Sequence, residues 1–261
     1  MQEIAVVVSN NNQNITPIET ITAIKGAGFQ NVFIQWLDAD WEYSQQQQLD
    51  FARQLGLNVL FVHLGWQNIN SIWEAGDTGD KLVTRFIDDI KTCKENNIPM
   101  VIMHLTSGSE APLYNEIGLN RIRQITDFAK ENDIKVAFEN MKIKGYLEYV
   151  LGNITDANVG ICFDSGHCHA HFDDDFDFEL YKNRIFAIHL HDNDQSGDQH
   201  LMPFDGTTDW QWVVKNLKAR NYNGPITFEL VYAGKYLAQS PLEFYKKGYE
   251  VGQKLLAMFN N

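Results

Sequence analysis

Short apolar runs alternate with longer amphipathic segments along the whole chain. The apolar runs are rich in β-branched and aromatic residues and are four to seven residues long. Runs of this length and composition are typical of strands buried on both faces of a sheet. They predict eight strands, at Ile4–Val8, Val32–Trp36, Asn58–His63, Pro99–His104, Lys135–Glu139, Val159–Asp164, Ile185–His191 and Ile226–Glu229.

The segments between these strands carry apolar residues at helical spacing. Thr16 followed by Pro17 is typical of the start of a helix, and Gly26 or Gly28 is typical of its end. Further helices are predicted at Ser44–Leu55, Leu82–Cys93, Ile122–Ala129, Gly145–Leu151, Asp177–Lys182, Asp209–Ala219 and Leu242–Phe259.

The order of strands and helices indicates eight consecutive βα units. Such alternation predicts a parallel sheet, and eight units in 261 residues favour a closed (β/α)8 TIM barrel over an open α/β sheet. The first strand is not followed by the GxGxxG loop that an open dinucleotide-binding sheet usually carries. No linker or low-complexity tract interrupts the chain, so we predict one domain over residues 1–261.

Composition narrows the classes of partner. The formal net charge is −13, which disfavours nucleic acid and anionic membranes as partners. The amino terminus has no basic region before its short apolar run, so we expect no signal peptide, and no segment is long enough to span a membrane. The three cysteines form no CxxC pair, which fits reduced thiols and a cytoplasmic protein.

Potential metal ligands end six successive predicted strands. Strand carboxyl ends converge on one face of a barrel, where barrel enzymes keep their chemistry. One histidine or carboxylate there is commonly just a hydrogen-bonded polar residue, but six in succession predict a metal site for zinc, manganese or a similar divalent ion. The six are His63, His104, Glu139, Asp164, His189 and Glu229.

The segment 185–200 adds further nitrogen and carboxylate groups. His189 and His191 are two residues apart, so they point to the same side of a strand. A loop then brings Asp198 and His200 within reach of that strand end. Imidazole and carboxylate groups that converge in this way are suited to a divalent ion.

Several other residues of the same region have less specific interpretations. His167 directly follows the sixth predicted strand, and we expect His169 and His171 to be loop residues that support the ligands. Trp36 and Trp66 fit either the core or an aromatic wall for a small polar substrate.

Five short motifs resemble one known family. They are AFEN at 137–140, CFDSGH at 162–167, IHLHDN at 188–193, DQH at 198–200 and FEL at 228–230. Together they resemble the xylose-isomerase-like TIM barrels, which include sugar and sugar-phosphate isomerases and epimerases and the endonuclease-IV-type abasic-site nucleases. The resemblance covers nearly the whole chain.

The resemblance implies two alternative ligand sets. In the isomerases and epimerases four residues hold one divalent ion, and the matching positions here are Glu139, Asp164, His189 and Glu229. The endonucleases hold three zinc ions with a larger set. The positions that this set adds are His63, His104, His167, Asp198 and His200, so all nine residue types are present.

The chain differs from the family pattern at two points. His189 and His191 both precede an acidic residue by three positions, and His189 is preferred because HLxD fits better. His191 is then expected beside the ligands, in contact with substrate. Many epimerases have PGxG after this strand, whereas this chain has Pro203-Phe204-Asp205-Gly206. We therefore expect the backbone to lie farther from substrate there.

Two reactions fit these residues. A metal-dependent isomerase or epimerase moves a proton next to a carbonyl, with Glu139 and Glu229 as ligands and as the acid/base pair. An endonuclease-IV-type hydrolase instead cleaves a phosphodiester at a centre of two or three zinc ions. A barrel that binds metal without activity is a third interpretation.

Charge favours the isomerase. None of the six arginines falls clearly in a loop at the strand carboxyl ends, and Lys142 and Lys235 are among the few lysines near that mouth. A nuclease needs cations along the nucleic-acid backbone. We therefore expect a small sugar-like substrate without a tightly held phosphate, bound near Lys142 and Lys235. The expected cofactor is zinc or manganese, with magnesium or cobalt as alternatives, and an oligomer is compatible with the sequence.

Overall fold

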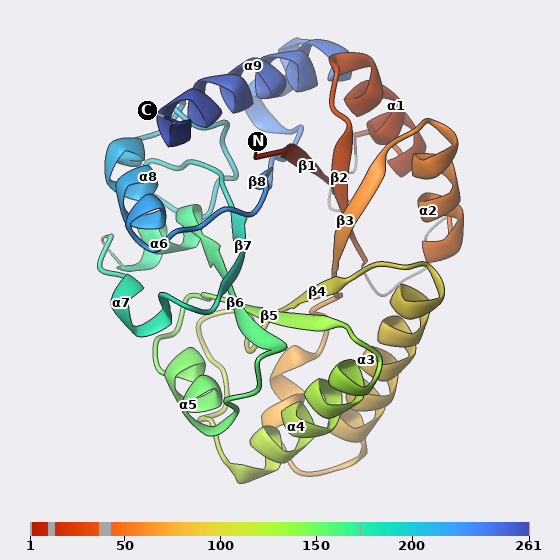
Figure 1. The fold of residues 1–261 in the computed structure, drawn as a ribbon, viewed down its shortest axis with the longest axis vertical. Helices are drawn as coiled ribbons and strands as arrows, with labels where there is room; N and C mark the ends of the chain where they lie inside the picture. Colours follow the sequence, from red (N-terminus) through yellow and green to blue (C-terminus); the bar gives the residue numbers. More distant parts are fainter. Residues whose placement is uncertain (1, 10–13, 37–42, 173, 261) are drawn as a thin grey trace.

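A computed structural model describes residues 2–9, 14–36, 43–172 and 174–260. Eight parallel strands follow one another around a barrel in the order β7-β6-β5-β4-β3-β2-β1-β8 (Figure 1). They are β1 Ile4–Val8, β2 Asn31–Gln35, β3 Asn58–His63, β4 Met100–Met103, β5 Lys135–Glu139, β6 Val159–Asp164, β7 Ile185–His189 and β8 Ile226–Phe228. The predicted (β/α)8 TIM barrel is confirmed.

The seam between β7 and β8 closes the barrel with few contacts. A single bridge pairs Leu190 with Phe228. Around it, the Leu190 amide donates to the Thr227 carbonyl at 2.9 Å, and the Glu229 amide donates to the Leu190 carbonyl at 3.3 Å. The barrel is therefore nearly closed, with its weakest pairing at this seam.

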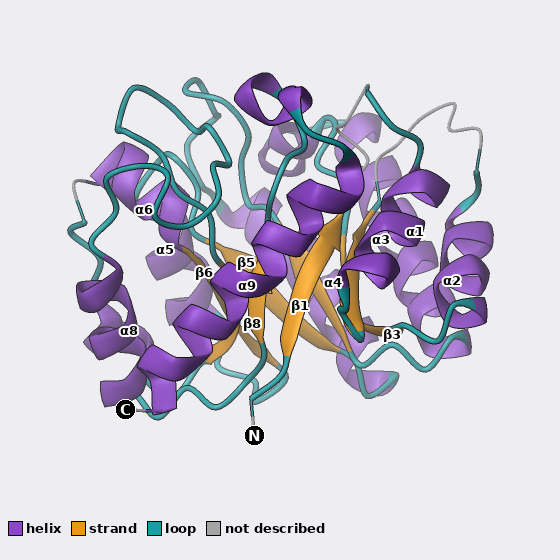
Figure 2. Ribbon diagram, turned by 90° about the horizontal axis from the view of Figure 1, so that it is seen from above, coloured by secondary structure: helices purple, strands orange, loops and turns teal. Residues whose placement is uncertain are grey.

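Helices surround the barrel, and long loops rise from the end where the strands finish (Figure 2). The α-helices are α1 Pro17–Ala27, α2 Gln45–Gln54, α3 Asp77–Glu95, α4 Glu116–Glu131, α5 Tyr146–Asn153, α6 Ser165–Phe172, α7 Phe178–Tyr181, α8 Trp210–Ala219 and α9 Pro241–Asn260. Two 3₁₀ helices, η1 Ile69–Trp73 and η2 Gly234–Ala238, lie in the loops. Of the helices that the structure describes, none combines the length and apolar character needed to cross a bilayer.

Capping explains why several helices begin where they do. The Thr16 side chain accepts from the Glu19 amide while the Glu19 carboxylate accepts from the Thr16 amide, which satisfies two amides that the helix leaves free. Ser44 and Gln47 form the same box at the start of α2. The predicted start of α1 at Pro17 is confirmed. Of the two predicted ends, Gly26 and Gly28, the helix ends before Gly28.

Helix α6 is the element that the sequence pattern did not predict. It begins directly after β6 and contains His167, His169 and His171, of which His169 and His171 were expected in a loop. Amphipathic spacing predicts helices with one buried face, whereas α6 is buried on most sides and has almost no polar stripe. Periodicity alone therefore could not reveal it.

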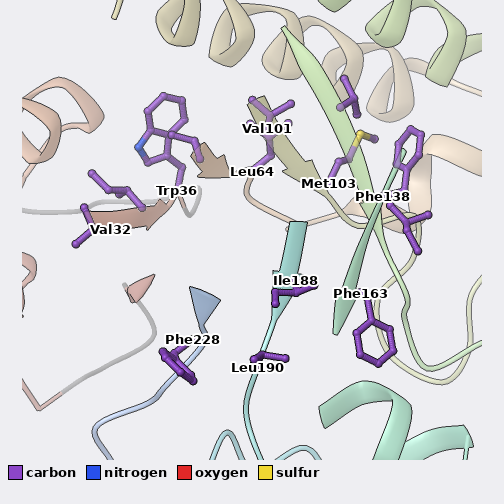
Figure 3. Close-up of a cluster of buried hydrophobic side chains, with 14 of the residues drawn as sticks. Val32, Trp36, Leu64, Val101, Met103, Phe138, Phe163, Ile188, Leu190 and Phe228 are labelled. Carbon is purple, nitrogen blue, oxygen red and sulfur yellow. The ribbon is translucent and has the colours of Figure 1, made fainter. Parts of the chain in front are cut away.

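The apolar core has two parts. The larger part fills the space between the strands and the helices, and Figure 3 shows Val32, Trp36, Phe138, Phe163 and Ile188 there among others. The smaller part fills the inside of the barrel. It consists of Val7, Phe33, Phe61, Met100, Ile102, Ala137, Cys162 and Ala187.

Candidate metal centre

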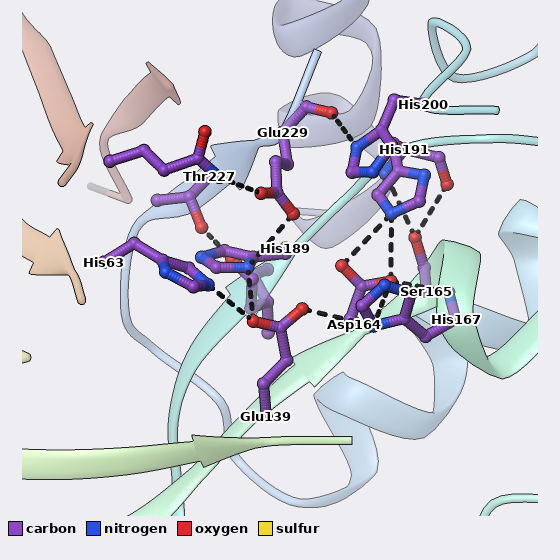
Figure 4. Close-up of polar contacts among 12 residues, drawn as sticks. His63, Glu139, Asp164, Ser165, His167, His189, His191, His200, Thr227 and Glu229 are labelled. Atoms are coloured by element: carbon purple, nitrogen blue, oxygen red, sulfur yellow. Dashed lines mark hydrogen bonds and ion pairs between the residues drawn. The ribbon is translucent and has the colours of Figure 1, made fainter. Parts of the chain in front are cut away.

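Four ligand-type side chains converge at the ends of β5 to β8, and we call them the inner group. They are Glu139, Asp164, His189 and Glu229, and one ligand atom from each lies within 4.8 Å of the others. The Nδ1 atom of His189 is 3.4 Å from Glu139 Oε2 and 3.4 Å from Glu229 Oε2 (Figure 4). The two glutamates thus approach His189 from different strands.

The ring of His189 rests on the apolar interior of the barrel. It stacks on Phe33 with ring centroids 4.8 Å apart and an interplanar angle of 8°. Neither of its nitrogens has a well-formed hydrogen bond among the described residues, although the Cys162 thiol lies beside the ring. Because buried polar atoms are normally paired, these nitrogens are suited to a ligand that the protein binds.

A second group lies at the ends of β3 and β4 and shares Glu139 with the inner group. It consists of His63, His104 and Glu139. The His63 Nδ1–H donates to the Leu64 carbonyl at 2.9 Å, which leaves Nε2 as an acceptor. That Nε2 is 3.1 Å from His104 Nε2 and 3.0 Å from Glu139 Oε2. Two imidazole nitrogens and a carboxylate this close together form a set that a divalent ion prefers.

An outer group is built from α6 and the loop after β7. His167 donates its Nδ1–H to the Asn140 carbonyl at 2.9 Å, and His200 donates its own to the Glu229 carbonyl at 3.0 Å. The Nε2 atoms of both rings lie 3.3 Å from Asp198 Oδ2. Metal-bound histidine usually has this arrangement, in which one ring nitrogen donates to a backbone carbonyl and the other points toward the metal position.

The pKa shifts of these groups are dominated by burial and by their neighbours. Burial alone would raise the pKa of Glu139, but His189 and His104 hold it well below its usual range. Burial would lower the pKa of His200, but Asp198 raises it to about 10. The carboxylates therefore stabilise positive charge in this site. A divalent cation can provide that charge in place of protonated histidines.

The three groups open into a cavity of about 430 Å³ at the strand carboxyl ends. Trp66 and His171 form part of its wall, and the Trp66 ring lies against His104 with centroids 5.1 Å apart. Lys142 is the single lysine among the described residues of the lining, and no arginine is present among them. The cavity is thus mainly acidic and imidazole-rich, with one aromatic wall.

Three residues expected to contact substrate lie elsewhere. Trp36 is 1% exposed and packs in the core, because its strand faces the helices at that position. Lys235 lies outside the cavity lining, 3.4 Å from Asp205, which provides the negative charge that pairs with it. His191 is fully buried between Asp164 and His200, so its ring does not reach the cavity wall.

Gln35 is a site residue that the sequence analysis missed. Its Nε2 donates to Glu229 Oε1 at 3.2 Å, and Ser9 donates to its Oε1 at 3.3 Å. Gln35 ends β2 just as the ligands end their strands. Its position at a strand end is the available signal, but glutamine is not a typical metal ligand and so does not stand out from the sequence.

Asp192 was also missed, and it organises the loop that carries Asp198 and His200. Its buried carboxylate accepts from the amides of Asn193, Phe204 and Thr208 and from the Trp210 indole, all at 2.9–3.0 Å. Phe204 has φ 73°, a left-handed conformation that usually selects glycine. Phe204 thus adopts a left-handed conformation although it is not glycine, and the expectation that the backbone lies farther from substrate here stays a prediction.

The fold and its three groups define a class, a (β/α)8 barrel with a candidate divalent-metal centre at the strand carboxyl ends. Within that class the family is specific. The model of the xylose isomerase-like TIM barrel matches residues 21–253, and the chain belongs to this family. The resemblance inferred from the motifs is thereby confirmed.

The chain is similar to relatives that are named for different activities. An inosose isomerase of Halalkalibacterium halodurans is 23% identical over 84% of each chain. A probable endonuclease 4 of Mycoplasma capricolum is 27% identical over 45% of this chain and 47% of that protein. The uncharacterized protein y4fM of Sinorhizobium fredii is 30% identical over 56% of this chain, and the match spans 46% of that relative.

Solved structures share the fold over almost the entire chain. A D-tagatose 3-epimerase-like protein has a TM-score of 0.77 and 20% identity, with 99% of this chain and 98% of that chain covered. The IolI protein, solved with a bound zinc atom, has a TM-score of 0.78 and 15% identity, with 98% and 99% covered. At these identities the likeness concerns the fold.

Proposed function

We propose that the protein is a divalent-metal-dependent isomerase or epimerase of a sugar-like substrate. The observation that carries this proposal is the placement of Glu139 and Glu229, which approach His189 from different strands at the floor of the cavity. The proposed reaction moves a proton at a carbon next to a carbonyl. Epimerisation by this route needs a base on one side of that carbon and an acid on the other, whereas isomerisation needs one base that takes the proton and returns it to the neighbouring carbon.

The inner group would hold the ion through Glu139, Asp164, His189 and Glu229. The donor set of carboxylate oxygens and imidazole nitrogen suits zinc or manganese, with magnesium or cobalt as alternatives. When bound, a divalent ion polarises a carbonyl and stabilises the negative charge of the enediolate. The His189 nitrogens without well-formed hydrogen bonds support this assignment.

Glu139 and Glu229 are proposed to exchange the proton. Histidines hold the pKa of both carboxyls below the usual range against the opposing effect of burial, so either carboxylate can take the proton. In an isomerisation the same carboxyl returns that proton to the neighbouring carbon, whereas in an epimerisation the other carboxyl first takes a proton from solvent and then donates it to the opposite face. Gln35 donates to Glu229 Oε1, which fixes that carboxylate and leaves Oε2 on the side of His189. Gln35 therefore holds the Glu229 carboxylate in one orientation, in which Oε2 could take the proton.

The proposed substrate is a neutral, polyhydroxylated carbonyl compound. Phosphate groups are usually held by arginine or by several lysines, whereas the described lining has one lysine, Lys142, and no arginine. Trp66 offers an aromatic face of the kind that binds the apolar side of a sugar ring. The likeness to an inosose isomerase over most of the chain is consistent with this class.

Deuterium exchange tests the proposal directly. The protein, loaded separately with Zn²⁺ and Mn²⁺, is incubated in D₂O with D-tagatose, D-allulose and an inosose, and NMR follows the protons next to each carbonyl. We expect metal-dependent loss of one such proton signal and appearance of an epimer or isomer. The proposal is wrong if no compound of this class exchanges although the metal-loaded protein is folded.

Phosphodiester hydrolysis is the second candidate because several overlapping groups of ligand-type side chains lie together, and His167 and His200 both lie 3.3 Å from Asp198. Two or three ions side by side activate water and stabilise both oxygens of the cleaved bond. The cavity nevertheless lacks the cations that track a nucleic-acid backbone. We expect no incision of duplex DNA with an abasic site at physiological salt. Efficient metal-dependent incision in a gel assay would reverse the ranking of the two functions.

A further inference from the structure

His191 lies between the inner group and the outer group and contacts both. Its Nε2 is 3.0 Å from Asp164 Oδ1 and 3.1 Å from Asp164 Oδ2. On its other side, its ring stacks on His200 with centroids 4.0 Å apart and an interplanar angle of 16°. Figure 4 shows the ring between these two residues. We propose that His191 is a positioning residue that orients one ligand of each group and thereby couples the two.

The contact with Asp164 is a hydrogen bond through which His191 acts on the inner group. Because Nε2 faces a carboxylate, it carries the proton and donates it. The Asp164 Oδ1 atom also accepts from the His167 amide at 2.6 Å. These two donors fix the plane of the Asp164 carboxylate and select the lone pairs that remain for an ion.

The contact with His200 acts on the outer group. The His200 Nδ1–H bond to the Glu229 carbonyl fixes one edge of that ring. Stacking on His191 fixes the plane of the ring, so Nε2 stays directed at Asp198. The two contacts together leave His200 a single orientation.

The stacked geometry argues against His191 as a ligand in the outer group. An imidazole binds an ion in the plane of its ring. The rings of His191 and His200 are nearly parallel, with centroids 4.0 Å apart, so their nitrogen lone pairs lie in two separate planes. One ligand atom of His191 nevertheless lies within 4.8 Å of those of Asp164 and His167, and likewise of those of Asp198 and His200. Direct coordination by His191 is therefore the alternative to a positioning role, and the NMR measurement below tests it.

The surroundings of His191 are shaped for this ring. Ser165 exchanges hydrogen bonds with the His191 backbone, its Oγ donating to the carbonyl at 3.0 Å and accepting from the amide at 3.2 Å. A Cβ atom on Gly166 would lie 1.9 Å from His191 Cε1, so only glycine leaves the required space. The Nδ1 atom has no hydrogen-bond partner among the described residues. A phenylalanine would stack without that unpaired nitrogen, so the hydrogen bond to Asp164 explains why an imidazole is present.

Two substitutions separate the two contacts. His191→Phe keeps the ring against His200 and removes the donor to Asp164, whereas His191→Gln keeps a donor and removes the ring. Isothermal titration calorimetry of the metal-free protein with Zn²⁺ alone measures the zinc affinity of both groups. Asp198→Asn removes a ligand of the outer group and so identifies which binding step belongs to that group. We expect the Phe variant to weaken inner binding about 10–100-fold, and the Gln variant to weaken outer binding by a similar factor. His169→Gln is the matched control, because His169 contacts Asp174 and Thr207 instead of the ligand groups.

The outcomes distinguish the alternatives. The proposal is contradicted if both variants lose zinc binding at the same group, or if zinc binding is unchanged in both. A second measurement uses the unmutated protein in case the Phe variant does not fold: ¹⁵N NMR of labelled histidine reads the state of His191 Nε2. We expect Nε2 to stay protonated with and without Zn²⁺, and its deprotonation by Zn²⁺ would make His191 a ligand. The inference rests on the proposed metal centre, but both readouts report metal binding, so failure of the isomerase assay leaves them interpretable.

Discussion

Two layers inside the barrel lie one above the other on the same strands and have opposite character. The lower layer is apolar and includes Phe61, Ala137, Cys162 and Ala187. The upper layer consists of ligand-type residues, each two positions further along its strand. The successive pairs are Phe61 and His63, Ala137 and Glu139, Cys162 and Asp164, and Ala187 and His189. Because alternate residues of a strand share a face, a step of two residues changes the layer without changing the side.

The apolar layer orients the side chains of the polar layer above it and keeps water away from them. Small residues lie below Glu139, Asp164 and His189, and the bulkier Phe33 and Phe61 fill the opposite side of the barrel. The His189 ring leans onto those two aromatic rings, which fixes its plane before any ligand is bound. The layer also removes water from below, which strengthens the attraction between the histidines and carboxylates above it.

The largest expected effect comes from removing one charge of the upper layer. Glu229→Gln keeps the shape of the side chain but loses a proposed base and ligand. We expect the turnover number to fall at least about 10²–10⁴-fold, together with weaker metal binding. Rates of deuterium exchange and metal content per chain measure the two effects. Glu250→Gln on the exposed face of α9 is the control and should leave both unchanged. Full activity of Glu229→Gln would contradict both proposed reactions.

A smaller effect is expected from closing the space beside the upper layer. Gly166→Ala places a Cβ atom 1.9 Å from the His191 ring and forces that ring to move. We expect a loss of about 1–3 kcal/mol in the free energy of unfolding, with weaker metal binding. Gly152→Ala is the matched helical control, because a Cβ there meets nothing within 4 Å. It should stabilise the protein by about 0.5–1 kcal/mol in urea unfolding. Equal stability of the two variants would contradict the steric argument.

The smallest effect concerns a buried carboxylate far from both layers. Asp89 in α3 accepts from Gln45 at 2.9 Å, and burial raises its pKa from 3.8 to about 6. A raised pKa means that its favourable contribution is complete below pH 3.8 and is lost as pH rises through about 6. Asp89→Asn should therefore stabilise the protein by about 1–2 kcal/mol at pH 8 and by little at pH 4.

Urea unfolding at the two pH values measures this difference. Asp88→Asn is the control, because the Asp88 side chain is 62% exposed and pairs with Lys91 on the surface. It should change stability by less than about 0.5 kcal/mol at either pH. A stabilisation by Asp89→Asn that is equal at pH 4 and pH 8 would show that burial of charge is not its cause. The result would sharpen the contrast with Glu139, whose pKa histidines lower despite similar burial.

Strand ends were the part of the structure that the sequence predicted best. Apolar runs bounded by His63, Glu139 and Asp164 predicted three of the strands to the residue. Side-chain orientation was predicted less well where loops and neighbouring elements decide it. Trp36 turned to the core, and His191 became enclosed by α6, a helix without the amphipathic pattern that would have revealed it. The assignment of the ligands to bound ions stays a prediction.

The seam between β7 and β8 gives the outer group a mechanical role. One bridge joins these strands, yet His200 on the loop after β7 is hydrogen-bonded to the Glu229 carbonyl just after β8. The His200 side chain therefore adds a hydrogen bond across the junction of the barrel that has the fewest strand pairings. An ion held by His167, Asp198 and His200 would connect α6 to the strands on both sides of this junction. We therefore expect metal binding in the outer group to stabilise the closed barrel.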